Sequence, residues 1–493
     1  MLRFTRRFSN SFRRFKKPVK DADGLYHGKF SQEEYEKASH YLRQQLDELE
    51  SSIKGNTNIR ENLGKMPSFP MATKTKPRVD NLSTLLEETI KTTGPLSLSA
   101  YMRQCLTHPQ FGYYTTRDPL DANTGDFITS PEISSVFGEV IGLYLFQIWA
   151  TQNRPNAIKL IEFGPGKGTL MCDVLTSFNK LTKKFAVNIE IELIETSRVL
   201  RKEQHKTLCG ANPYESTDTG DHSTTIWGNK IRWVENESEI TNNPEISNYV
   251  LAHEFFDALP IKSFQFTNNG WRELLVEHSP SVSNNTIALP EAEPSSEANS
   301  EGFDNEFHLT MTPKETPSSA IPTLSKRFEG LPVGTRIEIC PDAEFFIRKM
   351  ASLINNEKRL GSVLVIDYGV VDQIPDNTLR GIYKHGFVSP FFKPGEVDLS
   401  INVDFDNLKL LSKDMVMVLD PVDQGDFLHE LGIGHRIQQL LIKNNDSQET
   451  QEKVYNAYKR LTDKDSKSMG KIYKFFGLLP KGSEVPLGFQ KLV

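Results

Sequence analysis

A glycine-rich turn between an apolar run and a helical pattern constrains the fold of this chain more than any other feature. The segment reads LIEFGPGKGTLMCD over residues 160–173. Residues 158–163 are apolar enough for a buried strand, and residues 169–181 have helical spacing. Ligands bind outside the carboxyl ends of strands in sheets built from such strand–turn–helix units. The sequence therefore predicts a ligand-binding turn at this position.

The spacing of the glycines separates the ligands that such a turn could hold. A phosphate-binding P-loop requires Ser or Thr after Lys167, and Gly168 stands there instead. A dinucleotide fingerprint fits Gly164 and Gly166, but Thr169 occupies its third glycine position. The sequence thus argues strongly against a nucleotide phosphate and less strongly against a dinucleotide.

The remaining pattern is an acid, an aromatic residue and three alternating glycines, which is typical of S-adenosylmethionine (SAM) sites in doubly wound methyltransferases. Glycines let the backbone approach the cofactor without an intervening Cβ atom. A carboxylate such as Glu162 can pair with the ammonium group of SAM. Glu195 ends the next apolar run, where a second acid can bind the two ribose hydroxyls. The pattern comprises Glu162, Phe163, Gly164, Gly166 and Gly168.

Short apolar segments alternate with helical ones along most of the chain. This alternation predicts an α/β fold with a doubly wound, largely parallel sheet covered on both faces. A β-hairpin is expected around residues 268–270, because Asn-Asn-Gly suits a tight turn. The expected strands are residues 158–163, 187–195, 231–234, 249–253, 336–340, 362–367 and 415–419.

The first twenty residues form a basic leader. They hold five Arg and three Lys and no acid, and Phe4, Phe8, Phe12 and Phe15 recur at helical spacing. An amphipathic, Arg-rich and acid-free segment is typical of a mitochondrial transit peptide. Residues 1–20 are therefore expected to direct the chain into mitochondria and to lie outside the fold.

The rest of the chain is expected to contain a polar N-terminal part and one large domain. Residues 21–80 read as a polar helix and a linker, and a methyltransferase domain is expected over residues 81–493. Composition further predicts a helical cover over residues 81–150, a disordered insertion over residues 279–320 and a helical C-terminal part over residues 420–493.

Composition excludes several classes of function. The formal net charge is −6 over 493 residues, which argues against nucleic acid as a partner. The four cysteines form no Cys-x-x-Cys pair, so neither a disulfide scaffold nor a metal site is expected. The longest apolar run, residues 140–150, is too short to span a bilayer.

A second polar motif follows the fourth expected strand. Residues 253–260 read HEFFDALP, and polar side chains at a strand end, followed by aromatic ones, are a frequent site for an acceptor group. Glu254, Asp257 and His253 are the candidates for contact with the acceptor.

Long blocks of this sequence resemble the MidA-like family, whose mitochondrial members are protein arginine methyltransferases acting in complex I assembly. The blocks are GYYTTRDPLDANTGDFITSPEISSVFGE, EFGPGKGTLMCDVL, HEFFDALP, VLVIDYG, TLRGIYKHGFVSPFFKPGEVDLSINVDF and QGDFLHELGIGHR. The resemblance implies a SAM-dependent methyltransferase core with an extra helical region, located in the mitochondrial matrix. It also implies symmetric dimethylation of an arginine on a core quinone-site subunit of complex I.

The resemblance also assigns roles to residues. It implies that Asp126, Thr129 and Glu132 belong to an N-terminal cover over the cofactor. Residues 253–260 and 367–369 are then edges of the active site. Other arginine methyltransferases hold the guanidinium with a pair of glutamates on one loop, whereas here only Glu254 is present, with Asp257 nearby.

The expected chemistry is methyl transfer to a guanidinium nitrogen. A carboxylate can hold the positive charge on one nitrogen and leave another nitrogen's lone pair localised. Glu254 is the first candidate, followed by Asp257 and Glu132, and His253 could accept the released proton. Two alternatives stay open, which are a non-catalytic SAM-binding assembly chaperone and a methyltransferase for a small quinone precursor. The sequence does not indicate an oligomeric state.

Overall fold

The computed structural model describes residues 80–116, 129–279, 286–287, 307–358, 360–466 and 468–490. The predicted transit peptide and nearly all of the predicted polar helix and linker lie outside these residues. Asp126 lies outside them as well.

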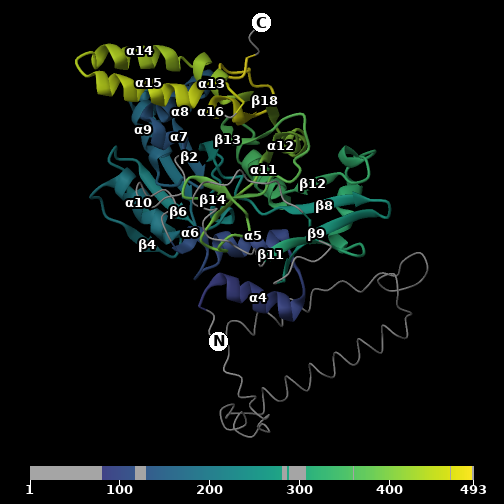
Figure 1. The fold of residues 1–493 in the computed structure, drawn as a ribbon. Coiled ribbons are helices and arrows are strands. Elements are labelled where there is room, and N and C mark those ends of the chain that lie inside the picture. The colour runs from purple at the N-terminus through teal and green to yellow at the C-terminus, as the bar shows by residue number, and fades with distance from the viewer. Residues whose placement is uncertain are drawn as a thin grey trace, which may run out of the picture. The chain divides into compact units, whose positions relative to one another are not determined.

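A mixed sheet forms the centre of the fold (Figure 1), and its strand order reverses at β2 (Ala157–Phe163). β2 pairs in parallel with β3 (Asn188–Ile194) on one side and with β7 (Ser247–His253) on the other. From β2 the chain builds outward through β3 to β6 (Lys230–Val234). It then returns to add β7 and β13 (Ser362–Val370), again in parallel. The predicted doubly wound α/β core is confirmed, with its switch point between β2 and β7.

Antiparallel strands complete both edges of this sheet. β19 (Tyr473–Leu479) pairs with β13, and β18 (Met417–Asp423) pairs with β19. At the other edge, β5 (Gly220–Thr224) pairs with β6, and β4 (Glu215–Thr217) pairs with β5. The sequence predicts a helical C-terminal part, but this part also supplies a strand, β19, which lies between β13 and β18 within the sheet.

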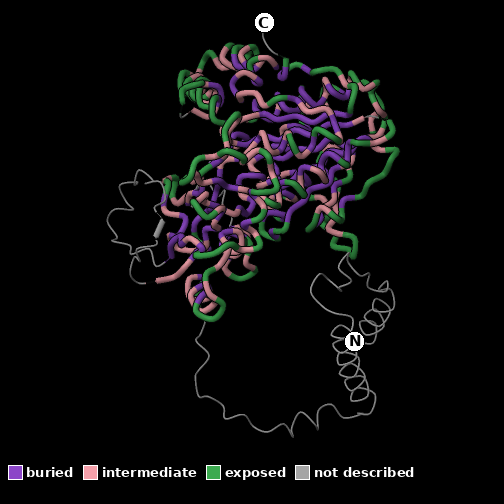
Figure 2. The backbone as a smooth tube through the Cα atoms, turned by 90° about the vertical axis from the view of Figure 1, so that its right-hand side faces the viewer, coloured by how far each residue is buried: buried purple, intermediate pink, exposed green. Residues whose placement is uncertain are grey.

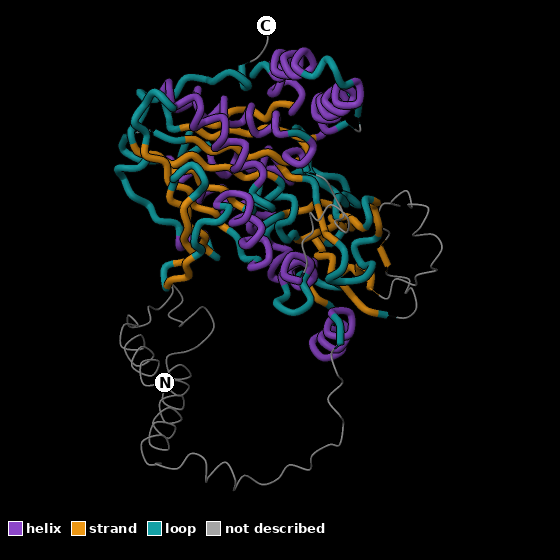
Figure 3. The backbone as a smooth tube through the Cα atoms, turned by 90° about the vertical axis from the view of Figure 1, so that its left-hand side faces the viewer, coloured by secondary structure: helices purple, strands orange, loops and turns teal. Residues whose placement is uncertain are grey.

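Helices cover the two faces of the sheet separately. Along β2, Ile158 and Leu160 pack into one core with α8 (Ser135–Thr151), α9 (Thr169–Thr182) and part of α10 (Arg198–Cys209). The alternate residues Ile161 and Phe163 pack into a second core with α11 (Pro341–Ile354) and α12 (Phe405–Ser412). Because strand side chains alternate between faces, a continuously apolar strand can supply both cores. Figure 2 shows the buried interior of the fold in purple, and Figure 3 shows the strands in orange with helices around them.

Further helices lie toward the two ends of the sequence. On the N-terminal side these are α4 (Leu82–Thr93), α5 (Leu98–Thr107), α6 (Tyr113–Thr116) and α7 (Ser130–Ile133). On the C-terminal side they are α13 (Gln424–Glu430), α14 (Ile433–Lys443), α15 (Gln448–Thr462) and α16 (Met469–Ile472). In the part of the chain that the structure describes, no helix is both long and apolar enough to cross a membrane.

A second, antiparallel sheet packs against α4 and α5. Its strand order is β10-β11-β9-β8-β12, and the two-residue β1 (Leu96–Ser97) also pairs with β9. The predicted hairpin is confirmed, since Thr267 of β8 pairs with Gly270 of β9 and Gly270 has φ 89°. The bounds are β8 Lys262–Thr267, β9 Gly270–His278, β10 Thr286–Ile287, β11 Phe307–Met311 and β12 Arg336–Ile339.

One sequence prediction is wrong in this part of the chain. Residues 307–311, assigned to a disordered insertion, form β11, and residues 317–320 form a 3₁₀-helix. Phe307 and Leu309 are buried against α5, which stabilises a short strand within a polar stretch. The strand predicted over residues 336–340 is present as β12, and it pairs antiparallel with β8 in this second sheet.

A small three-stranded sheet follows β13 along the chain. It comprises β14 (Arg380–Tyr383), β15 (Gly386–Val388) and β16 (Asp398–Ser400), with β14 in the middle. The next strand, β17 (Val403–Asp404), pairs in parallel with the end of β13. This connection brings residues of the 380–404 segment to the carboxyl end of the central sheet.

A buried ion network ties β2, β3 and β6 together. Lys159 Nζ lies 2.9 Å from Glu192 Oε2, and Arg232 Nη1 lies 2.6 Å from Glu192 Oε1. The side chains of Lys159 and Glu192 are 4% and 2% exposed. One carboxylate therefore neutralises two cations from the neighbouring strands.

Replacing Glu192 by leucine should destabilise the fold by about 3–5 kcal/mol, because a buried lysine is left without its counter-ion. Urea unfolding measures this change. The control is Glu203→Gln, whose partner Lys206 lies 3.6 Å away on the exposed face of α10 and should change stability by at most about 0.5 kcal/mol. Equal losses of stability in the two variants would show that the buried ion network does not stabilise the fold.

Candidate active site

The glycine turn connects β2 to α9 at the switch point of the central sheet. Gly164, Gly166 and Gly168 have φ values of 64°, 53° and 80°, which L-residues with a side chain rarely adopt. The amide N of Gly164 donates to the carbonyl O of Ile194 at 3.2 Å, so the turn is anchored to the end of β3. A Cβ on Gly164 would lie 3.3 Å from Phe255. The turn is thus strained for any other residue and closely packed.

Acidic side chains lie around this turn, and their environment favours a cation. Glu162 is 1% exposed and its Oε2 has no hydrogen-bond partner among the described residues. Burial, with a contribution from Glu132, raises the pKa of Glu162 to about 8. Glu132 comes from α7 and accepts a hydrogen bond from Thr129. The effect of Glu132 on the pKa of Glu162 shows that the two carboxyls are neighbours.

Asp173 belongs to the same group of acids and was missed by sequence reasoning. Burial, with help from Glu139 and Glu132, raises the pKa of Asp173 to about 7. Its Oδ2 has no hydrogen-bond partner in the described part of the chain. Gly138 of α8 packs against it so closely that a Cβ there would lie 2.4 Å from the Asp173 Cβ. This packing of α8 on α9 leaves Asp173 half-buried, and the sequence motif gives no signal of it.

Glu195 lies where the sequence predicts it, directly after β3. Its Oε1 accepts from the amide N of Ser197 at 2.7 Å, and its Oε2 accepts from Gln204 Nε2 at 3.1 Å. Burial raises the pKa of Glu195, and these two hydrogen bonds oppose that rise. Gln204 also donates to the carbonyl O of Gly166 at 2.7 Å. The predicted ribose acid and the glycine turn therefore share one bridging side chain.

The second cluster lies at the carboxyl end of β7. Glu254 has φ 49°, and its Oε1 accepts from the hydroxyl of Tyr473 at 3.0 Å. Burial, with repulsion from Asp257, holds the pKa of Glu254 well above its usual range. His253 Nε2 lies 3.6 Å from Glu254 Oε1, and burial lowers the pKa of His253 to about 3. His253 is therefore neutral, and it is a weak base.

Asp257 and Asp367 extend this cluster to the end of β13. Asp257 Oδ2 accepts from the hydroxyls of Tyr368 and Ser400, while its buried Oδ1 has no partner among the described residues. Burial and the neighbouring acids raise the pKa of Asp367. The guanidinium of Arg380 stacks 4.9 Å above the Tyr368 ring. Arg380 and Ser400 belong to the block TLRGIYKHGFVSPFFKPGEVDLSINVDF, which the resemblance marks, whereas Tyr473 comes from a distant strand that no sequence signal linked to the site.

Both clusters fit cationic ligand groups. Several buried carboxyls with raised pKa lie next to each other, and an arriving cation would favour their ionised forms. The ammonium and sulfonium groups of SAM and the guanidinium of an arginine are such cations. Glu162, Glu132 and Asp173 form the group near the glycine turn, and Glu254 and Asp257 form the group at the end of β7.

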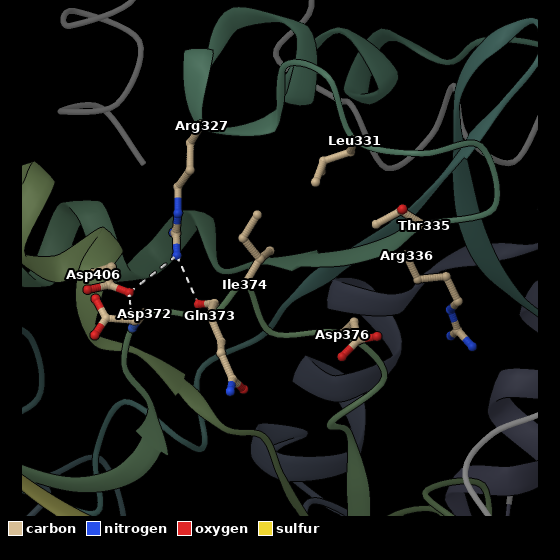
Figure 4. Close-up of a pocket in the computed structure, with 9 residues that line it drawn as sticks. All are labelled: Arg327, Leu331, Thr335, Arg336, Asp372, Gln373, Ile374, Asp376 and Asp406. Carbon is tan, nitrogen blue, oxygen red and sulfur yellow. Dashed lines mark hydrogen bonds and ion pairs between the residues drawn. The ribbon is translucent and has the colours of Figure 1, made fainter.

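A separate hollow of about 490 Å³ lies between the second sheet and the segment after β13 (Figure 4). Arg327 points toward Asp406 and donates to the carbonyl O of Gln373 at 3.1 Å, while Arg336 and Asp376 lie at the other end. No residue of the glycine turn or of the strand-end cluster lines it. Its lining comprises Arg327, Leu331, Thr335, Arg336, Asp372, Gln373, Ile374, Asp376 and Asp406.

The chain is similar to methyltransferases in sequence and in fold. Residues 140–421 match the family described as "Putative S-adenosyl-L-methionine-dependent methyltransferase". A relative from Danio rerio, "Protein arginine methyltransferase NDUFAF7, mitochondrial", is 35% identical over 80% of this chain and 86% of its own length. The protein of the same name from Homo sapiens is 33% identical over 79% of this chain and 81% of its own length.

Solved structures show the same fold. A Burkholderia thailandensis protein bound to S-adenosyl-homocysteine has a TM-score of 0.61 at 21% identity, and covers 82% of this chain and 93% of its own. A native structure from the same organism has a TM-score of 0.60 at 21% identity over 83% of this chain and 94% of its own.

Replacing Gly166 by valine should abolish SAM binding, because a β-branched residue does not adopt φ 53° without strain and would displace the turn. Calorimetric titration with SAM measures the loss. The control is Gly434→Ala in α14, where a Cβ meets nothing within 4 Å and affinity should stay unchanged. Tight binding by folded Gly166→Val would place the cofactor elsewhere.

Proposed function

The chain belongs to this family of S-adenosyl-L-methionine-dependent methyltransferases, and we propose that it methylates an arginine of a mitochondrial protein. The observation that carries the choice of acceptor is the buried carboxyl cluster at the ends of β7 and β13. An arginine side chain stays protonated at physiological pH, so its binding site must compensate a positive charge. The relatives are named mitochondrial protein arginine methyltransferases, which supports the same acceptor.

Within this proposal, Glu254 and Asp257 hold the acceptor guanidinium. The bound cofactor supplies an electrophilic methyl group on its sulfonium. Orientation of the two reactants by the protein can contribute roughly 7–11 kcal/mol to lowering the barrier. A carboxylate bonded to one guanidinium nitrogen localises charge there and leaves a second nitrogen to attack.

Transfer of a methyl cation to a guanidinium also releases one proton. His253 was expected to accept this proton, but its low pKa makes it a weak base. Glu254 and Asp257 are better suited, because their pKa values are raised and each ionises when the cationic acceptor binds. His253 then serves as a neutral neighbour of Glu254, 3.6 Å from its Oε1.

The finer proposal concerns location and partner. The relatives are named mitochondrial, and the leader of this chain has the composition of a transit peptide, so we place the protein in the mitochondrial matrix. The MidA-like resemblance points to symmetric dimethylation of a core quinone-site subunit of complex I. Purified full-length protein and methyl-labelled SAM, added to mitochondria from cells lacking it, test both statements.

Label recovered as symmetric dimethylarginine in one complex I subunit supports the proposal. Label found only in the lipid fraction would indicate a quinone-precursor methyltransferase instead. Restoration of complex I by a variant that cannot bind SAM would favour an assembly chaperone.

Glu254→Gln should reduce turnover at least about 100-fold while SAM affinity stays within about threefold, because the amide cannot carry the charge that pairs with guanidinium. Single-turnover methylation and calorimetry measure the two quantities. Glu329→Gln, in a loop of the second sheet, is the matched control and should keep wild-type turnover. Wild-type turnover in Glu254→Gln would remove this residue from the mechanism.

The efficiency kcat/KM for an acceptor peptide should rise with pH at SAM concentrations that saturate at each pH. The acceptor stays cationic, while Glu254 and Asp257 have raised pKa values and bind it best when ionised. The rise is therefore complete only above those raised values. A profile that falls over the same range would show that the site binds a neutral acceptor.

A further inference from the structure

Gln204 of α10 is a fully buried amide that contacts both halves of the cofactor site. Its Nε2 donates to the carbonyl O of Gly166 at 2.7 Å and to Glu195 Oε2 at 3.1 Å. Its Oε1 accepts from Trp233 Nε1 at 2.9 Å. The exposed fraction of Gln204 is 0%.

We propose that Gln204 is a positioning residue of the cofactor site, which holds the glycine turn and Glu195 at the separation that one SAM molecule spans. The proposal rests on the proposed placement of SAM at this turn. It adds a residue that touches no reacting atom and acts through Gly166 and Glu195.

The orientation of the Gln204 amide is fixed by its partners. Trp233 Nε1 can only donate, so the atom facing it must be the amide oxygen. The NH₂ group then faces Gly166 and Glu195, both of which offer acceptors, and its two protons match these two partners. Among residues of this size, only glutamine supplies two donors and one acceptor in this arrangement.

The backbone of α10 is docked on the turn as closely as its side chain. A Cβ on Gly168 would lie 3.4 Å from the Gln204 Cα and 3.3 Å from Leu208. Movement of α10 therefore moves the turn, and the bond from Gln204 to Gly166 fixes the two in one register.

Glu195 is held from two sides by this arrangement. The amide N of Ser197 donates to its Oε1 at 2.7 Å, and Gln204 donates to its Oε2. Each carboxylate oxygen has a further lone pair, which leaves one acceptor for each of two ribose hydroxyls. Without Gln204, Oε2 loses its anchor and the carboxylate can rotate away from the ribose.

A purely structural role for a satisfied core amide makes a different prediction. Loss of such an amide would lower the free energy of unfolding and leave the SAM affinity of the folded protein unchanged. A positioning role instead weakens SAM binding and raises KM for SAM, while kcat at saturating SAM is preserved.

The test compares Gln204→Glu with wild type by calorimetric titration with SAM and by steady-state kinetics. Glutamate has the same shape and keeps an oxygen toward Trp233, but when ionised it has no donor and repels Glu195, and when protonated it keeps one donor in place of two. SAM affinity should fall roughly 10- to 100-fold, as expected for loss of hydrogen bonds to a charged group, and kcat should stay within about twofold.

Two further variants keep the test decisive. Trp233→Phe removes the third hydrogen bond together with part of a buried ring but keeps both donor bonds of Gln204, and it should change SAM affinity by less than about fivefold. If Gln204→Glu does not fold, Gln204→Met serves, since it keeps the length and removes both donors. Wild-type affinity in the folded variant, or a fall in kcat with unchanged affinity, would overturn the positioning role.

The same titrations separate this proposal from the one it rests on. If Gly166→Val and Glu195→Ala lose SAM binding while Gln204→Glu does not, only the role of Gln204 fails. If all three bind SAM normally, the cofactor lies elsewhere and both proposals fail.

Discussion

Parallel pairing of β2 with β3 on one side and β7 on the other is the constraint on which the rest of this structure depends. The segment after β2 turns toward one face of the sheet and the segment after β7 turns toward the other. The two segments therefore diverge at the carboxyl end of the sheet. At this carboxyl end lie the glycine turn, Glu195 and Glu254, which follow three separate strands. Because all strands here are parallel, their carboxyl ends need no loop to bring them together.

Burial of acids is the physical feature that both clusters at this edge share. A carboxyl group in a protein interior has a raised pKa unless a cation or hydrogen-bond donors compensate it. Burial is the main cause of the raised pKa of Glu162, Asp173, Glu195 and Glu254, and hydrogen-bond donors oppose it at Glu195 and Glu254. A methyltransferase whose cofactor is cationic and whose acceptor is a guanidinium uses such groups twice, once for each reactant.

The core of the fold could be predicted from the sequence, and the glycine turn and Glu195 lie at the strand ends where the sequence predicts them, because both features are local signals. The alternation of apolar strands with helices and the position of Glu195 at a strand end are each visible within about ten residues. Asp173, Gln204 and Tyr473 could not be found this way, since their roles depend on helices and strands that pack from far along the chain. β11 was missed because five residues, FHLTM, carry too short a pattern within a polar stretch.

Backbone strain at Glu254 gives the strand-end cluster its rigidity. A non-glycine residue at φ 49° costs on the order of 1–3 kcal/mol and persists only where its surroundings fix it. Here the amide N of Glu254 donates to the carbonyl O of Ile366 at 2.9 Å, and Asp367 accepts from the amides of Phe256 and Asp257 at 3.0 and 3.3 Å. The end of β13 thus holds the turn after β7 in a conformation that it would not adopt alone. The proposed acceptor site therefore depends on β13 for its geometry as much as on β7 for its acids.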